Sequence, residues 1–290
     1  MKPDAFRPRK VSVVVATYNR ADYLRLSLAC LLAQDYGSAM QIVVADDGST
    51  DKTADVLEGA REASANIPIL HCWHEHAQYR RARTLNGGVL MSDGDLLVFL
   101  DSDCLPARNL VSVYAAHAAE GCFYLGGVYG LSQPFSQGTL ADGAAANVET
   151  VLARAADRDN QVPGASRRVW GRYWKSRLYV RLNLRKPKIW GGNLAVNRHV
   201  FEQVNGFDEN FVGHGQEDSD LRDRLFRGGF SPICLHTKAC AYHLWHPVDL
   251  KARQEALGDG NNRPYYRRPR VDVVCRNGLR KLSVPGAGPH

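Results

Sequence analysis

The composition of the chain indicates a globular protein with one large core. Its 290 residues are 44% hydrophobic and carry a formal net charge of +7, which suits a single α/β domain. No apolar run approaches the roughly 20 residues that a transmembrane helix needs, and the first residues lack the apolar stretch of a signal peptide. Seven cysteines without a Cys-x-x-Cys spacing fit reduced thiols better than disulfides or a zinc site. We therefore expect a soluble, cytoplasmic protein.

The N-terminal half alternates strand and helix patterns. Apolar, largely β-branched runs at residues 11–16, 41–45, 67–72 and 95–100 predict four strands. Apolar residues at helical spacing predict three helices, one over residues 24–32, one around residues 56–60 and one over residues 82–91. Continuous apolar strands separated by helices predict a mainly parallel sheet with helices on both faces.

Polar clusters follow three of these strands. They are Thr17-Tyr18-Asn19-Arg20, Asp46-Asp47-Gly48-Ser49 and Asp101-Ser102-Asp103. Ligands of parallel α/β sheets bind at the carboxyl ends of the strands, so we expect the three clusters to meet at one edge. Taken singly, each cluster is also what an ordinary turn contains, because Asp-Gly and Asn-rich turns often end strands and cap helices.

Two acids open a predicted helix in the second half of the chain. Leu221 and Leu225 recur at helical spacing before the stop signal Gly228-Gly229. Glu217 and Asp218 then fall in the first helical turn, where the positive end of the helix dipole favours the ionised carboxylate. Such an acid either balances the dipole or serves as a general base.

The C-terminal segment is strongly basic. Between residues 263 and 281, seven Arg and Lys side chains stand against one acid, Asp272. Such a segment is either a solvated arm or a peripheral contact for an anionic membrane surface. A second basic stretch, residues 167–188, is interleaved with aromatic residues. Neither stretch resembles a nucleic-acid-binding module, and we expect no nucleic-acid partner.

The motifs occur in a fixed order along the chain. They occupy residues 11–20, 45–51 and 100–103, followed by Trp190-Gly191-Gly192-Asn193 and Glu217-Asp218. In this order they resemble the motifs of family 2 glycosyltransferases with the GT-A fold. Residues 206–229 are also similar to the catalytic region of β-1,4-galactosyltransferases and bacterial chondroitin polymerases. The resemblance covers roughly residues 11–246. It implies an inverting enzyme that moves a hexose or N-acetylhexosamine from a UDP-sugar to a hydroxyl of a glycan, lipid carrier, peptide or small metabolite.

The resemblance implies a donor site at the sheet edge. Asp46 and Asp47 would meet the uracil and ribose. Arg81 would pair with the diphosphate unless it is a surface arginine, and Asn193, after the close backbone approach of Gly191-Gly192, would hydrogen-bond the sugar unless this stretch is a simple turn. The implied donor contacts are Thr17, Tyr18, Asn19, Arg20, Asp46, Asp47, Arg81, Asp101, Ser102, Asp103, Gly191, Gly192 and Asn193.

The resemblance also implies a metal and a base. Asp101-Ser102-Asp103 resembles the Asp-x-Asp element, which reaches the ribose and a divalent ion that bridges the two phosphates. Asp103 is the implied metal ligand, and either His243 or His246 completes the shell, unless both are packed histidines. An imidazole ligand suits Mn²⁺ at least as well as Mg²⁺. Asp218 is the implied base, with Glu217 beside it.

We expect one GT-A domain at residues 1–250, followed by a basic extension at residues 251–290. Residues 11–105 would form its nucleotide-binding half and residues 106–250 its acceptor-binding and catalytic half, with acceptor contacts in residues 131–188. Two other classes stay open. One is a sugar-nucleotide-forming nucleotidyltransferase, although no Gly-rich, Arg-containing triphosphate loop follows the first strand. The other is a non-catalytic nucleotide- or glycan-binding module.

Overall fold

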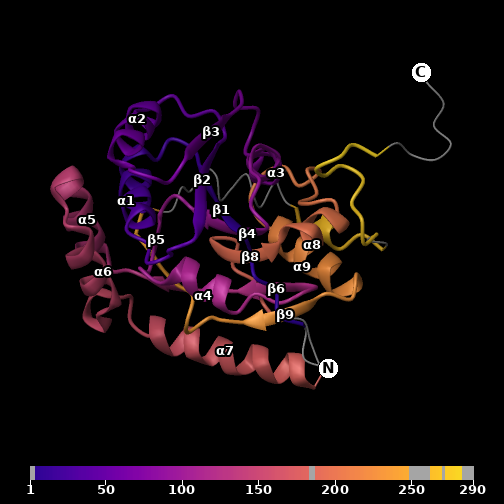
Figure 1. Cartoon of the computed structure of the whole chain (residues 1–290). Helices are drawn as coiled ribbons and strands as arrows, with labels where there is room; N and C mark the ends of the chain where they lie inside the picture. Colours follow the sequence, from indigo (N-terminus) through magenta and orange to yellow (C-terminus); the bar gives the residue numbers. More distant parts are fainter. Residues whose placement is uncertain (1–3, 183–186, 248–261, 270–271, 283–290) are drawn as a thin grey trace.

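A seven-stranded sheet forms the centre of the molecule (Figure 1). The computed structural model describes residues 4–182, 187–247, 262–269 and 272–282. From one edge to the other, the strands are β3 (Ile69–Trp73), β2 (Ala39–Asp46), β1 (Lys10–Thr17), β4 (Leu96–Asp101), β8 (Asn193–Asn197), β6 (Cys122–Leu125) and β9 (Ser231–Cys234). Only β8 runs antiparallel to its neighbours. The prediction of a mainly parallel sheet flanked by helices is confirmed.

Helices cover both faces of this sheet. On one face lie α1 (Ala21–Leu32), α2 (Thr53–Ala63) and α4 (Leu110–Ala116), and on the other lie α3 (Arg81–Met91), α8 (Arg198–Gln203) and α9 (Glu217–Arg227). Alternation along β1 explains how one strand serves two cores, because Val13 and Val15 point to the first and Val14 to the second. All three are fully buried, and each such side chain contributes about 1.5–3 kcal/mol.

A smaller sheet lies beside the first. Its strands, in order, are β5 (Cys104–Pro106), β10 (Cys240–His243) and β7 (Gly127–Gly130). A third apolar core joins this sheet to α1 and to α5 (Gln133–Asp142), α6 (Val148–Ala156) and α7 (Ala165–Arg181), with η1 (Gly143–Ala145) and η2 (Arg158–Asn160) between them. In Figure 1, α7 runs along the lower edge of the molecule. No helix in the described ranges is both long and apolar enough to cross a membrane.

The four predicted strands and three predicted helices of the N-terminal half are all present. Their bounds differ by a few residues, as for α1, which begins at Ala21 and ends at Leu32. Residues 131–188 carry no family motif, and their described part folds mainly into α5, α6 and α7. All seven cysteines are free thiols, as expected.

The described part of the C-terminal segment packs back onto the domain. Helix α11 (Arg263–Tyr266) lies against the loop before α9, and residues 272–282 lie against the turn after α8. Asn205 Nδ2 donates to the carbonyl oxygens of Cys275 at 2.7 Å and Arg280 at 2.8 Å. This part of the segment is therefore docked and is not a solvated arm. The predicted domain boundary at residue 250 lies outside the described residues.

Candidate active site

Asp103, His243 and His246 form a compact group at the junction of the two sheets. Strand β5 begins directly after Asp103 and pairs antiparallel with β10, with Cys104 opposite His243. This register places His243 Nε2 3.5 Å from Asp103 Oδ1, while His246 Nε2 lies 3.4 Å from Asp103 Oδ2. One ligand atom from each residue lies within 4.8 Å of the other two. The sequence left the choice between the two histidines open, and the geometry brings in both.

The chemistry of this group fits a divalent transition metal. Burial opposes the charge on Asp103, but the hydrogen bond to His246 and the positive charges of His243, His246 and Arg20 outweigh it, so the pKa of Asp103 lies below its ordinary value. An ionised carboxylate with two imidazoles is a donor set that suits Mn²⁺. Three protein ligands also leave coordination positions for substrate oxygens.

Arg81 ties three predicted motifs together. Its Nη2 donates to Asp101 Oδ1 at 2.7 Å and to the Gly191 carbonyl oxygen at 3.0 Å, and its Nη1 donates to Glu217 Oε1 at 3.3 Å. The side chain is only 8% exposed. The guanidinium is buried and bound to two carboxylates and a carbonyl oxygen, and its pairing with the donor diphosphate stays a prediction. In this geometry Arg81 holds the end of β4 and the start of α9 against the turn at Gly191-Gly192, the glycine turn.

Glu217 lies in a buried position that is unusual for an acid. Burial is the largest cause that raises its pKa; the charge of Arg81 opposes this, the charge of Asp218 adds to it, and the net pKa is about 7. Glu217 Oε2 is buried and has no hydrogen-bond partner among the described residues. Its neighbour Asp218 is only half-buried and accepts a 2.6 Å hydrogen bond from the Ser219 backbone N–H. The two adjacent acids therefore sit in different environments.

The glycine pair before β8 makes room for two of these acids. A Cβ at Gly192 would lie 2.7 Å from Asp101 Oδ2, and one at Gly191 would lie 3.2 Å from Asp218 Oδ2. The first distance is shorter than real Cβ contacts, so a larger residue at position 192 would displace the Asp101 carboxylate. The turn thus brings the Asp-x-Asp element and the acid pair to the same stretch of backbone.

Asn193 does not face this site. Its side chain is 1% exposed and accepts a 2.7 Å hydrogen bond from the Tyr114 hydroxyl, while its Nδ2 donates to the carbonyl oxygens of Gly127 and Ala239. The amide therefore joins the two sheets, and both of its N–H donors are used there. Contact of Asn193 with the donor sugar stays a prediction.

Asp46 and Asp47 lie at the end of β2, both buried. Burial opposes the charge on Asp46, but hydrogen bonds from His71 and Ser49 outweigh it and lower its pKa. For Asp47 the effect of burial is the larger one, and its pKa is raised although Arg80 donates a backbone hydrogen bond. Contact of these acids with a nucleotide stays a prediction.

Three histidines surround this pair of acids, a role that sequence reasoning missed. His71 Nε2 lies 2.9 Å from Asp46, and His74 and His76 lie 3.4 and 3.5 Å from Asp47. Strand β3 pairs in parallel with β2, with His71 opposite Val44, so the strand register is the signal that points to these contacts. His74 Nε2 also lies 2.9 Å from the Thr84 hydroxyl.

The loop after β1 reaches the same region. Tyr18 stacks on His76, with ring centroids 4.2 Å apart and planes 11° apart. Asn19 holds the neighbouring loop, since its Oδ1 accepts from the Thr50 N–H at 2.9 Å. Thr17 is buried, and its hydroxyl has no partner in the part of the chain that the structure describes. Ser102 is buried beside β1. Contact of Thr17, Tyr18, Asn19 and Arg20 with a donor stays a prediction.

Arg20 lies beside the group formed by Asp103, His243 and His246. Its Nη2 lies 3.4 Å from His246 Nδ1, and its guanidinium stacks over the Tyr23 ring at 5.1 Å. Its positive charge is among the causes that lower the pKa of Asp103.

Tyr79 is a further residue that the motifs did not indicate. Burial raises the pKa of Tyr79, and the charges of Arg81, Asp101, Glu217 and Asp103 all act on its hydroxyl, which places this ring among the site acids.

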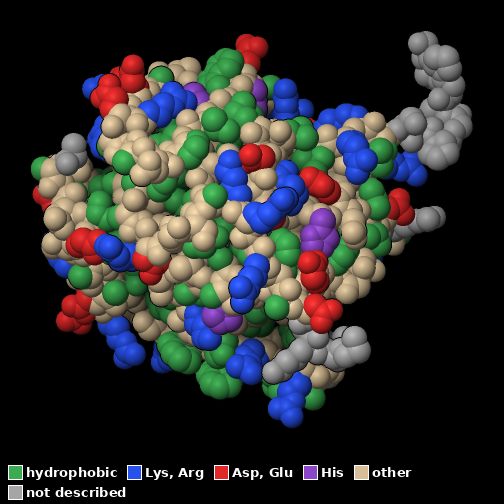
Figure 2. All heavy atoms as spheres, in the orientation of Figure 1, with side chains coloured by type: hydrophobic (Ala, Val, Ile, Leu, Met, Phe, Trp, Pro, Cys, Tyr) green, Lys and Arg blue, Asp and Glu red, His purple; other side chains and the backbone are tan. Residues whose placement is uncertain are grey.

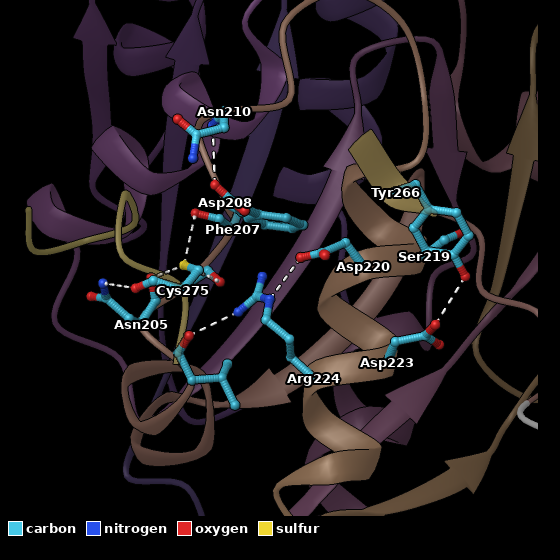
Figure 3. Close-up of polar contacts among 12 residues, drawn as sticks. Asn205, Phe207, Asp208, Asn210, Ser219, Asp220, Asp223, Arg224, Tyr266 and Cys275 are labelled. Atoms are coloured by element: carbon cyan, nitrogen blue, oxygen red, sulfur yellow. Dashed lines mark hydrogen bonds and ion pairs between the residues drawn. The ribbon is translucent and has the colours of Figure 1, made fainter. Parts of the chain in front are cut away.

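A buried ionic network on α9 follows the acid pair Glu217-Asp218 in the chain, and Figure 3 shows its members Asp220 and Arg224. Asp220 Oδ2 accepts a 2.6 Å hydrogen bond from Arg224 Nε, and both side chains are almost completely buried. Arg268, from the C-terminal segment, lies 3.0 Å from the other oxygen of Asp220. Tyr266 donates to Asp223 at 2.9 Å, and Asn262 donates to the Gly215 carbonyl oxygen at 2.9 Å, in the turn before α9. The segment after residue 261 therefore fixes the helix that begins with Glu217.

Sequence comparison assigns the chain to a family. The model of Glycosyl transferase family 2 matches residues 12–204, and the model described as the N-terminal domain of galactosyltransferase matches residues 175–246. The chain belongs to glycosyl transferase family 2. The two matched ranges together cover the motifs from β1 to His246, which confirms the family resemblance expected from the sequence.

Two curated relatives show how the family match extends. Validoxylamine A glucosyltransferase of Streptomyces hygroscopicus subsp. jinggangensis is 32% identical over 262 residues, which are 85% of this chain and 58% of that protein. Chondroitin synthase of Escherichia coli is 26% identical over 259 residues, which are 86% of this chain and 36% of that protein. The chain thus spans little more than half of the first relative and about a third of the second.

Solved structures confirm the GT-A fold of this family 2 chain. A mannosyltransferase from Pyrobaculum calidifontis, in complex with GDP-Man and Mn²⁺, superimposes with a TM-score of 0.58 at 22% identity, over 87% of this chain and 61% of that one. S. aureus TarS 1-349, in complex with UDP-GlcNAc, superimposes with a TM-score of 0.56 at 19% identity, over 83% and 60%.

Proposed function

We propose that the chain is a metal-dependent, inverting glycosyltransferase that moves a hexose or N-acetylhexosamine from a UDP-sugar to a hydroxyl acceptor. The observation that carries the proposal is the group Asp103, His243 and His246, set at the same sheet edge as the Asp218 carboxylate. Family membership and the names of both relatives support sugar transfer. Neighbours of the same fold bind UDP-GlcNAc, or GDP-Man with Mn²⁺, which supports a sugar nucleotide and a metal for this chain.

In this proposal the carboxylate of Asp103 and the imidazoles of His243 and His246 hold Mn²⁺ or Mg²⁺. The bound ion would neutralise the negative charge that the leaving diphosphate gains. Arg20 lies beside the same group and would add a second positive charge there. Arg81 would also position the site, because its bonds to Asp101 and Glu217 set the relative positions of the Asp-x-Asp element and α9.

Asp218 is the proposed general base. It is half-buried, and its Oδ2 lies beside the Gly191 turn, whereas Glu217 is buried and paired with Arg81. Asp218 would accept the proton of the acceptor hydroxyl while that oxygen forms a bond to the anomeric carbon. The bond from that carbon to the UDP oxygen breaks on the opposite face, so the anomeric configuration inverts. Residues 131–188, with α5 to α7, stay the proposed source of acceptor contacts.

The test is release of nucleoside diphosphate from a panel of UDP-sugars and GDP-mannose, with Mn²⁺ or with a chelator. We expect Mn²⁺-dependent release of UDP from one UDP-sugar, accelerated when a hydroxyl acceptor is supplied. Pyrophosphate released from UTP and a sugar phosphate would instead show a nucleotidyltransferase. UDP that binds without any transfer or hydrolysis over a broad acceptor panel would show a binding module.

A further inference from the structure

Helix α7 exposes a row of large apolar side chains. Trp170 is 46% exposed, Trp174 60%, Leu178 51% and Leu182, at the C-terminal cap, 53%. They recur every fourth residue, so each lies one turn beyond the last and about 40° further around the helix. The four side chains form one gently winding row about 18 Å long on the outside of the molecule.

The buried side chains on the inner face of α7 are small in comparison with this row. Its buried residues are Ala165, Val169 and Ser176, and Arg172 stacks on the Trp190 ring at 3.6 Å. A helix of a soluble domain normally turns its largest apolar side chains toward the core. In α7 these four large apolar residues are exposed, so packing against the described part of the domain does not account for them.

Positive charge surrounds the row. Helix α7 contains six basic residues and no acid. Five of the six are exposed, namely Arg167, Arg168, Lys175, Arg177 and Arg181. Their spacing along the helix puts them between and beside the members of the apolar row. In Figure 2, hydrophobic and basic side chains gather along the lower edge, where α7 runs in Figure 1.

We propose that the outer face of α7 binds the surface of a membrane that contains anionic phospholipids. Transfer of tryptophan and leucine side chains from water to the boundary between headgroups and acyl chains is favourable. Long Arg and Lys side chains beside them reach the lipid phosphates while their carbon stems stay in the apolar layer. One helix thus presents both contacts that such a surface requires.

Charge and shape favour a lipid surface over other occupants of this face. A second copy docked on the same face would set five cations against five cations, and like charges across an interface disfavour association. Nucleic acid matches the charge, and its bases stack on tryptophan. It offers no apolar layer, however, for Leu178 and Leu182. A lipid bilayer with acidic headgroups matches both the positive charge of this face and the apolar side chains of the row.

The inner side of α7 connects this face to the active site. Arg172 stacks on Trp190, and Trp190 directly precedes Gly191, whose carbonyl oxygen accepts from Arg81. A bilayer bound to the outer face of α7 would therefore be separated from the glycine turn of the site by the helix itself and the Arg172–Trp190 contact. The proposal itself is independent of the proposed transfer reaction, since binding is measured without substrate.

Cosedimentation with vesicles tests the proposal. Vesicles of phosphatidylcholine alone are compared with vesicles that also contain phosphatidylglycerol, using the wild type, the double variant Trp174→Glu/Leu178→Glu and the matched control Leu90→Glu. Leu90 is 66% exposed but lies on α3. We expect binding to the anionic vesicles only, at least about tenfold weaker for the double variant and unchanged for the control. Equal urea midpoints for all three proteins would show that folding is intact.

Tryptophan fluorescence gives a second readout. In a Trp73→Phe background, which removes another exposed tryptophan, brominated lipids should quench emission only in anionic vesicles. The proposal is overturned by absence of vesicle binding, by equal binding of the double variant, or by a dimer in solution that the double variant dissociates. Retention of the wild type by nucleic acid in place of anionic vesicles would also overturn it.

Discussion

Arg81 donates two hydrogen bonds to the same carboxylate oxygen of Asp101, from Nη2 at 2.7 Å and from Nε at 3.1 Å. Its Nη1 lies 3.3 Å from Glu217 Oε1. One side chain of α3 therefore joins the end of β4 to the start of α9, two segments far apart in sequence. This bridge sets the distance between the Asp-x-Asp element and the acid pair.

Replacement of Arg81 should destabilise the fold. Arg81→Ala leaves Glu217 buried without its cation, and removal of one partner of a buried pair costs about 3 kcal/mol or more. Arg81→Lys keeps the charge but not the fork of donors, so we expect an intermediate loss. Urea denaturation measures both. Arg83→Ala, two residues along α3 and exposed, is the matched control and should change stability by less than about 0.5 kcal/mol.

Glu217 should make stability depend on pH. Burial raises its pKa from 4.5 to about 7, so between these values the folded protein holds a proton that the unfolded chain has lost. The stability that Glu217 contributes is therefore fully present below about pH 4.5 and is lost as the pH rises through about 7. Between about pH 5 and about pH 8, the melting temperature of the wild type should fall relative to that of Glu217→Gln. A constant difference would show that Glu217 is ionised throughout.

Each member of the metal group should contribute to Mn²⁺ affinity. Loss of a residue that hydrogen-bonds a metal ligand weakens metal affinity by about 10–100-fold. Loss of a ligand itself should weaken Mn²⁺ binding at least as much. We therefore expect Asp103→Ala, His243→Ala and His246→Ala each to weaken Mn²⁺ binding by at least about tenfold. Electron paramagnetic resonance of free Mn²⁺ measures this directly. His199→Ala removes an exposed histidine outside the group and should leave the affinity unchanged, whereas full affinity in His246→Ala would remove that residue from the site.

The C-terminal segment should stabilise the domain through Arg268. Its guanidinium lies 3.0 Å from Asp220 and 3.4 Å from Asp208, and stacks over the Tyr265 ring at 4.1 Å. Arg268→Ala should lower the free energy of unfolding by about 1–2 kcal/mol, because charge-assisted contacts to buried acids are lost. The neighbour Arg267 is exposed, so Arg267→Ala is the control. Equal midpoints for the two variants would mean that the docked segment adds no stability through its charge.

The strands and helices could be predicted from the sequence where a local pattern of apolar residues specifies them. Apolar runs such as residues 11–16 and the spacing of Leu221 and Leu225 each specify one element, and the parallel order follows from their alternation. The acid pair at the first turn of α9 is present as predicted. No local pattern specified α7, because its large apolar residues face outward and do not mark a buried stripe.

Partners across long sequence distances could not be predicted in the same way. Arg81 and Glu217 are 136 residues apart, and only the packing of α3 against the glycine turn makes them a pair. Asn193 shows the same limit, since its place in a motif does not reveal that its side chain points to Tyr114 and the second sheet. The docking of Arg268 onto Asp220 likewise depends on where the C-terminal segment returns to the domain.

The most direct test of the account is the transfer rate of Asp218→Asn with the donor that the wild type uses, with UDP affinity measured on the same protein. If Asp218 is the base, the rate should fall by about 10²–10⁴-fold while Mn²⁺-dependent UDP binding stays at the wild-type value. Transfer near the wild-type rate in a folded variant that binds UDP normally would contradict the assignment of this acid and the mechanism built on it.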